Sequence, residues 1–176
     1  MSDCVCCGHE LPSGCISCAG CGSPNYFLIA QGLMQDESIK QTYWDTARLA
    51  GWMRDGLACV YCGKDMLDSY DVTYHGYATD HLLPVNQYKE LDSQGWNRVL
   101  TCRACNSFKQ DWNPNDPPLY TPGGQPGVAV RSELLNRAKE FVRQKRQARE
   151  ALFQREQQAI QRAFKSLKAG LAAAAK

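Results

Sequence analysis

Two cysteine pairs of the form Cys-x-x-Cys constrain the fold of this chain more than any other feature. Cys59 and Cys62 form the first pair, Cys102 and Cys105 form the second, and 39 residues lie between the pairs. Four thiolates arranged as two such hooks can fill one tetrahedral zinc site, which closes the intervening segment into a loop. We therefore expect a small central domain that is held together by structural zinc.

The distribution of the ten cysteines favours metal binding over disulfides. Six lie before Asn25, four lie in the central stretch, and none follows Cys105. Every central cysteine belongs to a Cys-x-x-Cys pair, which is typical of metal sites in a reducing compartment. The chain has no signal-peptide pattern and no apolar run of about 20 residues. We expect a cytoplasmic protein that does not bind a membrane.

Residues 1–25 form a second cysteine-rich segment with almost no material for an apolar core. The pattern Cys-x-x-Cys-Gly occurs twice there, with ten residues between the hooks. Glycine after the second cysteine lets the turn close with backbone N–H groups facing the sulfur atoms. The repeat predicts a zinc-ribbon-like segment with the ligands Cys4, Cys7, Cys18 and Cys21. The spacing leaves a Cys15–Cys18 hook open, and the other candidate ligands are Cys6, His9 and Cys15.

The remaining pattern predicts a mixed helix and strand domain. Apolar residues recur at three- and four-residue intervals over residues 36–55, which predicts a helix whose Trp44 and Trp52 pack against the central domain. A β-prone run between residues 71 and 79 predicts a strand. A polar loop that runs to Gly95 comes next. A short extended piece at 98–101 and a helix from 106 to about 112 follow this loop.

The C-terminal quarter is predicted to be one basic helix. Residues 113–130 are rich in proline and glycine and predict a linker or a wrapped loop, and Ser132 is the expected N-cap of the helix over 131–176. That helix carries 12 Lys and Arg against 4 Asp and Glu, a net charge of +8, whereas residues 1–130 carry −6. An acidic part joined to a basic helix predicts a polyanionic partner.

The polar residues between the central hooks are of the types that phosphodiester hydrolysis requires. The reaction needs a base for water, a Lewis acid for the phosphate charge, and a frame that holds both. Asp80 is a hard oxygen ligand for Mg²⁺ or Mn²⁺, and His81 can take up a proton near neutral pH. Neighbours on a strand point to opposite faces, so Asp80 and His81 share a site only if the backbone turns there. The amide of Asn106, directly after the second hook, could be another metal ligand.

The central stretch closely resembles the HNH endonucleases, also called ββα-metal nucleases. The resemblance covers about 50 of the 176 residues. It rests on Cys59-x-x-Cys62, Asp80-His81-x-x-Pro84, Trp96-Asn97-Arg98-Val99-Leu100 and Cys102-x-x-Cys105-Asn106-x-x-Lys109. It implies an α+β fold with a small ββα-metal core that is clamped by a zinc site of four cysteines. We place the nuclease domain, with its leading helix, at residues 36–112.

The resemblance also implies a role for each residue of the site. His81 is expected to be the general base that activates water, and Asp80 and Asn106 to bind one catalytic divalent ion, Mg²⁺ or Mn²⁺. Asn97 corresponds to the middle asparagine of the family, which fixes the loop and helps to orient the histidine. Many members of the family have histidine where this chain has Asn106, a difference that bears on metal preference.

These features together predict a metal-dependent DNA endonuclease that cleaves or nicks its substrate. Duplex DNA is the expected partner, in preference to RNA. Lys109 matches a family position near the backbone phosphates, and we expect Arg103 to bind nucleic acid as well. The basic helix would grip DNA, or couple the protein to a partner or a second copy. The alternative is a non-catalytic, zinc-dependent nucleic-acid-binding or adaptor module, which would not require the full set of site residues.

Overall fold

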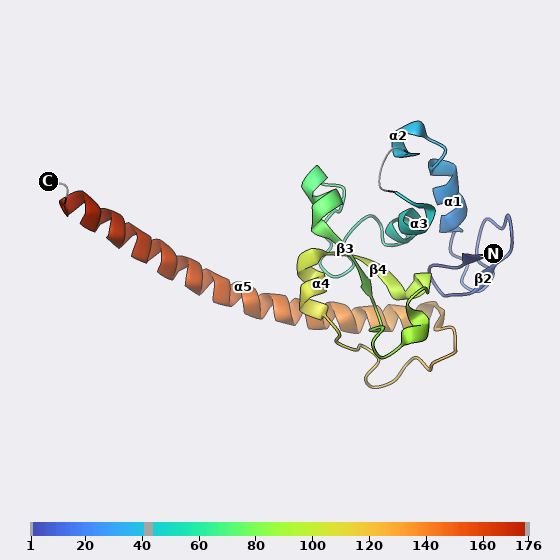
Figure 1. The fold of residues 1–176 in the computed structure, drawn as a ribbon. Coiled ribbons are helices and arrows are strands. Elements are labelled where there is room, and N and C mark those ends of the chain that lie inside the picture. The colour runs from blue at the N-terminus through green and yellow to red at the C-terminus, as the bar shows by residue number, and fades with distance from the viewer. Residues whose placement is uncertain (1, 41–43, 175–176) are drawn as a thin grey trace. The chain divides into compact units, whose positions relative to one another are not determined.

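The computed structural model describes residues 2–40 and 44–174, which form two units, Met1–Val142 and Arg143–Lys176. The first unit mixes short helices with two-stranded sheets and contains two clusters of four cysteines. The second unit is part of a single long helix, α5 (Gly127–Ala174) (Figure 1). Within the described residues, no helix is both long enough and apolar enough to span a bilayer.

An antiparallel hairpin followed by a helix forms the centre of the first unit. β3 (Tyr77–His81) pairs with β4 (Arg98–Cys102), so that Asp80 lies opposite Val99 and His81 opposite Arg98. The chain turns directly from β4 into α4 (Arg103–Lys109), which packs against both strands (Figure 1). The predicted extended piece is therefore confirmed, but the helix begins earlier than residue 106 because Cys105 must face Cys102 across the corner.

The segment before β3 differs from its prediction. Val72–Gly76 forms one wide turn of π-helix instead of a strand, and extended structure begins only at Tyr77. The Ser69 hydroxyl accepts a bond from the Val72 N–H, and the Thr73 hydroxyl donates to the Met66 carbonyl. Local bonds of this kind compete with strand pairing and override the β propensity of the run.

The loop between the two strands contains two short 3₁₀ turns, Lys89–Leu91 and Gly95–Asn97. Its apolar side chains fill the main core together with residues of the hairpin and of the first turns of α5. Apart from the cysteines, the most deeply buried members are Met66, Leu82, Leu83, Trp96, Val99, Leu134, Ala138 and Val142. The beginning of α5 therefore belongs to the first unit and completes its core.

The N-terminal part consists of β1 (Ser2–Asp3), β2 (Glu10–Leu11), α1 (Tyr26–Leu33), α2 (Glu37–Lys40) and α3 (Thr46–Arg54). The single helix predicted over 36–55 is thus divided, with residues 41–43 outside the described part. Asp45 caps α3 by accepting a bond from the Arg48 N–H, and α1 packs against α3. Trp52 lies in the main core with Trp44 packed against it, as predicted.

Arg54, at the end of α3, joins three parts of this unit. Its side chain is 4% exposed and donates to the carbonyl oxygens of Val5, Gly95 and Arg98. It also forms a paired contact with Asp55, whose carboxylate accepts the Leu100 N–H. A buried guanidinium can be retained only when its donors are satisfied, so these bonds fix the N-terminal segment beside the loop and β4.

The segment rich in proline and glycine is an ordered loop around one asparagine. The buried Asn115 side chain accepts from the Leu119 and Tyr120 N–H groups and donates to the Tyr120 carbonyl. The predicted N-cap at Ser132 is wrong, because α5 already begins at Gly127. No proline follows Pro126, so none interrupts a helix that begins at Gly127. Within the first turns of α5, the Arg131 side chain donates to the Trp96 carbonyl.

Candidate functional site

The four central cysteines form one cluster, as predicted. All sulfur atoms of Cys59, Cys62, Cys102 and Cys105 lie within 4.8 Å of one another, and the Cys62–Cys102 distance is 3.9 Å. Four sulfur atoms bound to zinc at about 2.3 Å would stand about 3.8 Å apart. The cluster therefore fits a zinc ion that ties the first hook to the corner between β4 and α4.

The thiols of this cluster share protons in a way that suits a cation. Hydrogen bonds from Cys105 and Cys59 hold the pKa of the Cys102 thiol far below its ordinary value, while bonding to Cys102 and Cys59 raises that of Cys105. Zinc binding would replace the protons of these thiols, because cysteine binds zinc in its deprotonated form.

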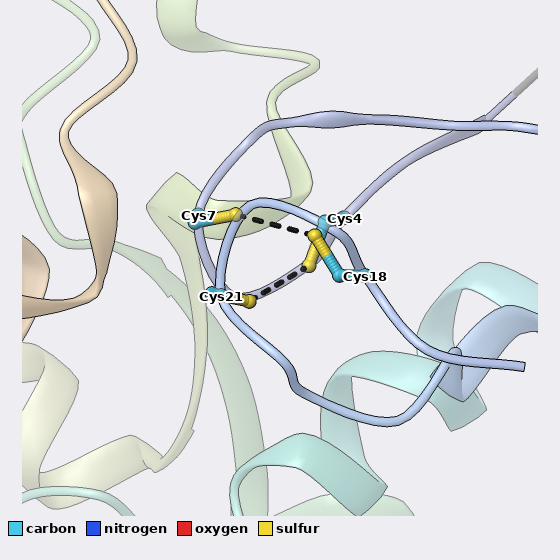
Figure 2. A group of neighbouring side chains, drawn as sticks. All are labelled: Cys4, Cys7, Cys18 and Cys21. Carbon is cyan, nitrogen blue, oxygen red and sulfur yellow. Dashed lines mark hydrogen bonds between the residues drawn. The ribbon is translucent and has the colours of Figure 1, made fainter.

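The second cluster has the same construction (Figure 2). The sulfur atoms of Cys4 and Cys21 are 3.8 Å apart and those of Cys7 and Cys18 are 3.7 Å apart, and all four lie within 4.8 Å. Each hook closes through a glycine N–H that bonds to the carbonyl of the first cysteine. The candidate ligands that lie outside the cluster are Cys6, His9 and Cys15. Both clusters are fully thiolate sites, so neither offers an open position for hydrolysis.

Three of the predicted site residues line one open pocket of about 340 Å³. Asp80 and His81 reach it from the end of β3, and Asn106 reaches it from the first turns of α4. Ser107 and Asp111 complete its polar wall. A carboxylate, an imidazole and an amide are therefore gathered at the junction of strand and helix, which only the hairpin and the packing of α4 could bring together.

Two buried donors fix the carboxylate of Asp80. The Tyr61 hydroxyl donates to Oδ2 at 2.5 Å, and the Lys109 ammonium lies 3.4 Å from the same oxygen. Burial raises the pKa of Asp80, and the neighbouring ammonium and hydroxyl act in the opposite direction. Burial likewise lowers the pKa of Lys109 and raises that of Tyr61. Because neither the Asp80 carboxylate nor the Lys109 ammonium is well hydrated, this ion pair is held in one geometry.

The two residues expected to bind nucleic acid have different positions. Arg103 is exposed at the start of α4, where it can meet a phosphate. Lys109 is 1% exposed, and its ammonium also donates to the His81 carbonyl at 2.7 Å. This burial argues against the predicted contact of Lys109 with phosphate, because its donors are already directed at Asp80 and the backbone.

The imidazole of His81 is partly exposed and has one neighbour that orients it. Its Nε2 atom lies 3.2 Å from the carbonyl oxygen of Asp92 and 3.4 Å from the carboxylate of the same residue. Donation from Nε2–H to that carbonyl assigns the tautomer in which Nδ1 carries a lone pair. The ring is thus held by the loop rather than by another strand.

Asn97 does not reach the pocket but holds the loop that orients His81. It is completely buried, its Oδ1 accepts the Leu83 N–H at 2.7 Å, and its Nδ2 donates to the Leu83 and Leu91 carbonyls. Its own carbonyl accepts the Leu82 N–H. These bonds agree with the loop-fixing role that the family resemblance implies for Asn97.

Two residues of the site, Tyr61 and Asp92, were not predicted from the sequence. Tyr61 lies inside the first hook, where a buried hydroxyl needs a partner, and this position was the available signal. Asp92 lies in a polar loop whose path depends on Asn97, so its place beside His81 had no local signal.

Comparisons with family models, with curated proteins and with solved structures found no match to this chain.

Proposed function

We propose that the protein is a metal-dependent DNA endonuclease of the HNH, or ββα-metal, type, with β3, β4 and α4 as its catalytic core. The observation that carries this proposal is that Asp80, His81 and Asn106 line one open pocket. A hairpin and a helix joined by a cluster of four cysteines agree with the architecture expected from the resemblance. An adaptor that only binds DNA would not need this set of groups in one pocket.

The donor set at the pocket fits a divalent cation. Asp80 offers a carboxylate oxygen and Asn106 an amide oxygen, which are the hard ligands that Mg²⁺ and Mn²⁺ prefer. The ion would neutralise the charge that develops on the scissile phosphate. Tyr61 and Lys109 keep the Asp80 carboxylate directed at one position, so little reorganisation is needed when the ion and the phosphate bind.

His81 would act as the base through Nδ1. With Nε2–H directed to the Asp92 carbonyl, Nδ1 is the nitrogen that can take the proton from an attacking water. The Lys109 bond to the His81 carbonyl fixes the backbone at the same residue. The exposed Arg103 and the basic C-terminal helix would contribute contacts with DNA phosphates, whose strength falls with rising salt.

A plasmid assay distinguishes the enzyme from the adaptor. We expect zinc-loaded protein to convert supercoiled plasmid to nicked or linear DNA when Mg²⁺ or Mn²⁺ is added, and not when both are omitted. EDTA added at the start of the reaction should stop it, with the zinc content measured alongside so that unfolding is recognised. Asn106→Ala removes a proposed ligand of the divalent ion and should abolish activity at low Mg²⁺. Tight binding without any cleavage would favour the adaptor.

Removal of the Tyr61 hydroxyl is expected to weaken divalent metal binding. Tyr61→Phe keeps the buried ring but removes the donor to Asp80, so the Mg²⁺ concentration for half-maximal cleavage should rise about 10- to 100-fold. Zinc content should not change, because no cysteine is altered. Tyr26→Phe removes a hydroxyl from a partly buried ring outside the pocket and serves as the control. An unchanged Mg²⁺ requirement in Tyr61→Phe would contradict this positioning role.

A further inference from the structure

A second hollow, of about 300 Å³, has walls made largely of aromatic rings. We call it the aromatic pocket, and its lining includes Trp44, Arg48, Tyr70, Tyr74, His75 and Tyr77. The Tyr70 ring lies 5.0 Å from Tyr74 and 5.5 Å from His75 between centroids. Tyr70 is 68% exposed, although a large aromatic side chain is usually covered. The rings thus present apolar faces to a space that the protein itself does not fill.

A groove of about 390 Å³ connects the aromatic pocket with the candidate active site. Arg48 and Trp52 line both the groove and the aromatic pocket, whereas Thr79 and His81 line both the groove and the pocket that contains Asp80. The groove therefore adjoins both of the other hollows, and a strand bound in the aromatic pocket could follow it to His81.

The groove has positive groups where a polyanion would run. Arg98 is exposed in it, and the Arg48 side chain is 33% exposed, with its guanidinium carbon 5.9 Å from the centre of the Tyr77 ring. Asp45 at the rim lies 3.7 Å from Arg48 but is itself well exposed, so water screens this pair. Two arginines between an aromatic hollow and a catalytic histidine match the alternation of base and phosphate in a nucleic-acid strand.

The wall shared by the two hollows also contains an unused donor. Trp52 is 3% exposed, and its indole Nε1–H has no acceptor among the described residues. Buried donors are paired in the great majority of structures, but this atom is covered from solvent, so a ligand could supply its acceptor only by moving the wall.

We propose that the aromatic pocket binds the base of an unpaired nucleotide, and that the groove carries the adjoining phosphates to His81. Stacking on aromatic rings needs a free base face, which a continuous duplex does not offer. The proposal rests on the proposed nuclease function and specifies its substrate class as DNA with a single-stranded stretch beside the cut. It narrows the expected duplex DNA partner to a duplex that carries such a stretch.

Binding can be tested without cleavage by fluorescence anisotropy in a His81→Ala background of the full chain. Three labelled DNAs are compared: an oligothymidylate, a duplex, and the duplex with a short single-stranded gap. We expect the gapped and single-stranded DNAs to bind at least about 10-fold more tightly than the duplex. Adding Tyr70→Ala should weaken their binding about 5- to 150-fold, as alanine substitution at base-stacking rings does, and leave the duplex unaffected.

Matched variants separate stacking from other effects. Tyr70→Phe keeps the ring face and should retain the preference, whereas Ile16→Ala removes an exposed apolar side chain outside the pocket and should change nothing. Equal affinity for all three DNAs, or full binding by Tyr70→Ala, would overturn the proposal. Cleavage of an uninterrupted duplex that Tyr70→Ala does not impair would leave the nuclease function standing and refute this inference alone. A preference for gapped DNA in a protein that never cuts would support the binding of an unpaired base and refute the nuclease function.

Discussion

Replacing His81 with alanine is expected to slow DNA cleavage by about 10²- to 10⁴-fold, because the reaction loses the group that accepts a proton from water. The fold should survive. The side chain is 25% exposed, and its polar contacts are with Asp92 alone, so its removal leaves no buried group unsatisfied. The measurement is the initial rate of plasmid nicking at saturating Mg²⁺, with circular dichroism and zinc content recorded for the same sample.

His9→Ala is the matched control for this variant. His9 is also exposed and lies outside both the pocket and the cysteine cluster, so its loss should leave the nicking rate unchanged. DNA affinity in the absence of cleavage should be similar for both variants, which separates catalysis from binding. A His81→Ala protein that still cuts at the original rate would show that another group is the base.

Loss of one central zinc ligand should unfold the first unit. Cys105 is completely buried where β4 meets α4, and Cys105→Ser would remove one of the four sulfur ligands. Structural zinc contributes about 10–16 kcal/mol in small domains, as much as the whole stability of a typical domain of about 5–15 kcal/mol. We expect one zinc ion fewer per chain by elemental analysis, loss of the cooperative thermal transition, and loss of cleavage.

Cys15→Ser provides the control for this effect. Cys15 is partly buried but lies outside both clusters, where its carbonyl accepts a bond from the Asn25 side chain. Its replacement should leave zinc content and melting temperature unchanged. If Cys105→Ser retained its full zinc content, or if Cys15→Ser lost zinc, the ligand sets assigned to the two clusters would be incorrect.

Spacing in the sequence was sufficient to predict both cysteine clusters. Cysteine hooks are local, and zinc geometry leaves few ways to combine two of them, so Cys59 and Cys105 could be assigned to one site before any fold was known. The loop-fixing position of Asn97 and the extended segment before Cys102 followed from the family resemblance and from local pattern. The catalytic roles of Asp80, His81 and Asn106 remain predictions.

The parts that depend on distant contacts were not predictable. A lysine is usually solvated, and Lys109 is buried only because Asp80, 29 residues earlier, supplies its counter-charge. The turn before β3 depends on bonds from Ser69 and Thr73 that outweigh strand propensity. The early start of α5 depends on Arg131, which is anchored at Trp96 on another element.

The bonds of Arg54 have a consequence for how this protein can be altered. Because one guanidinium is shared by the backbone at Val5, Gly95 and Arg98, the N-terminal cysteine segment is not an interchangeable accessory. Trimming the chain to its central hairpin and α4, or grafting that part onto a different leader, would leave one donor without its acceptor at the edge of the groove. Such chimeras would have to supply a substitute carbonyl at that point.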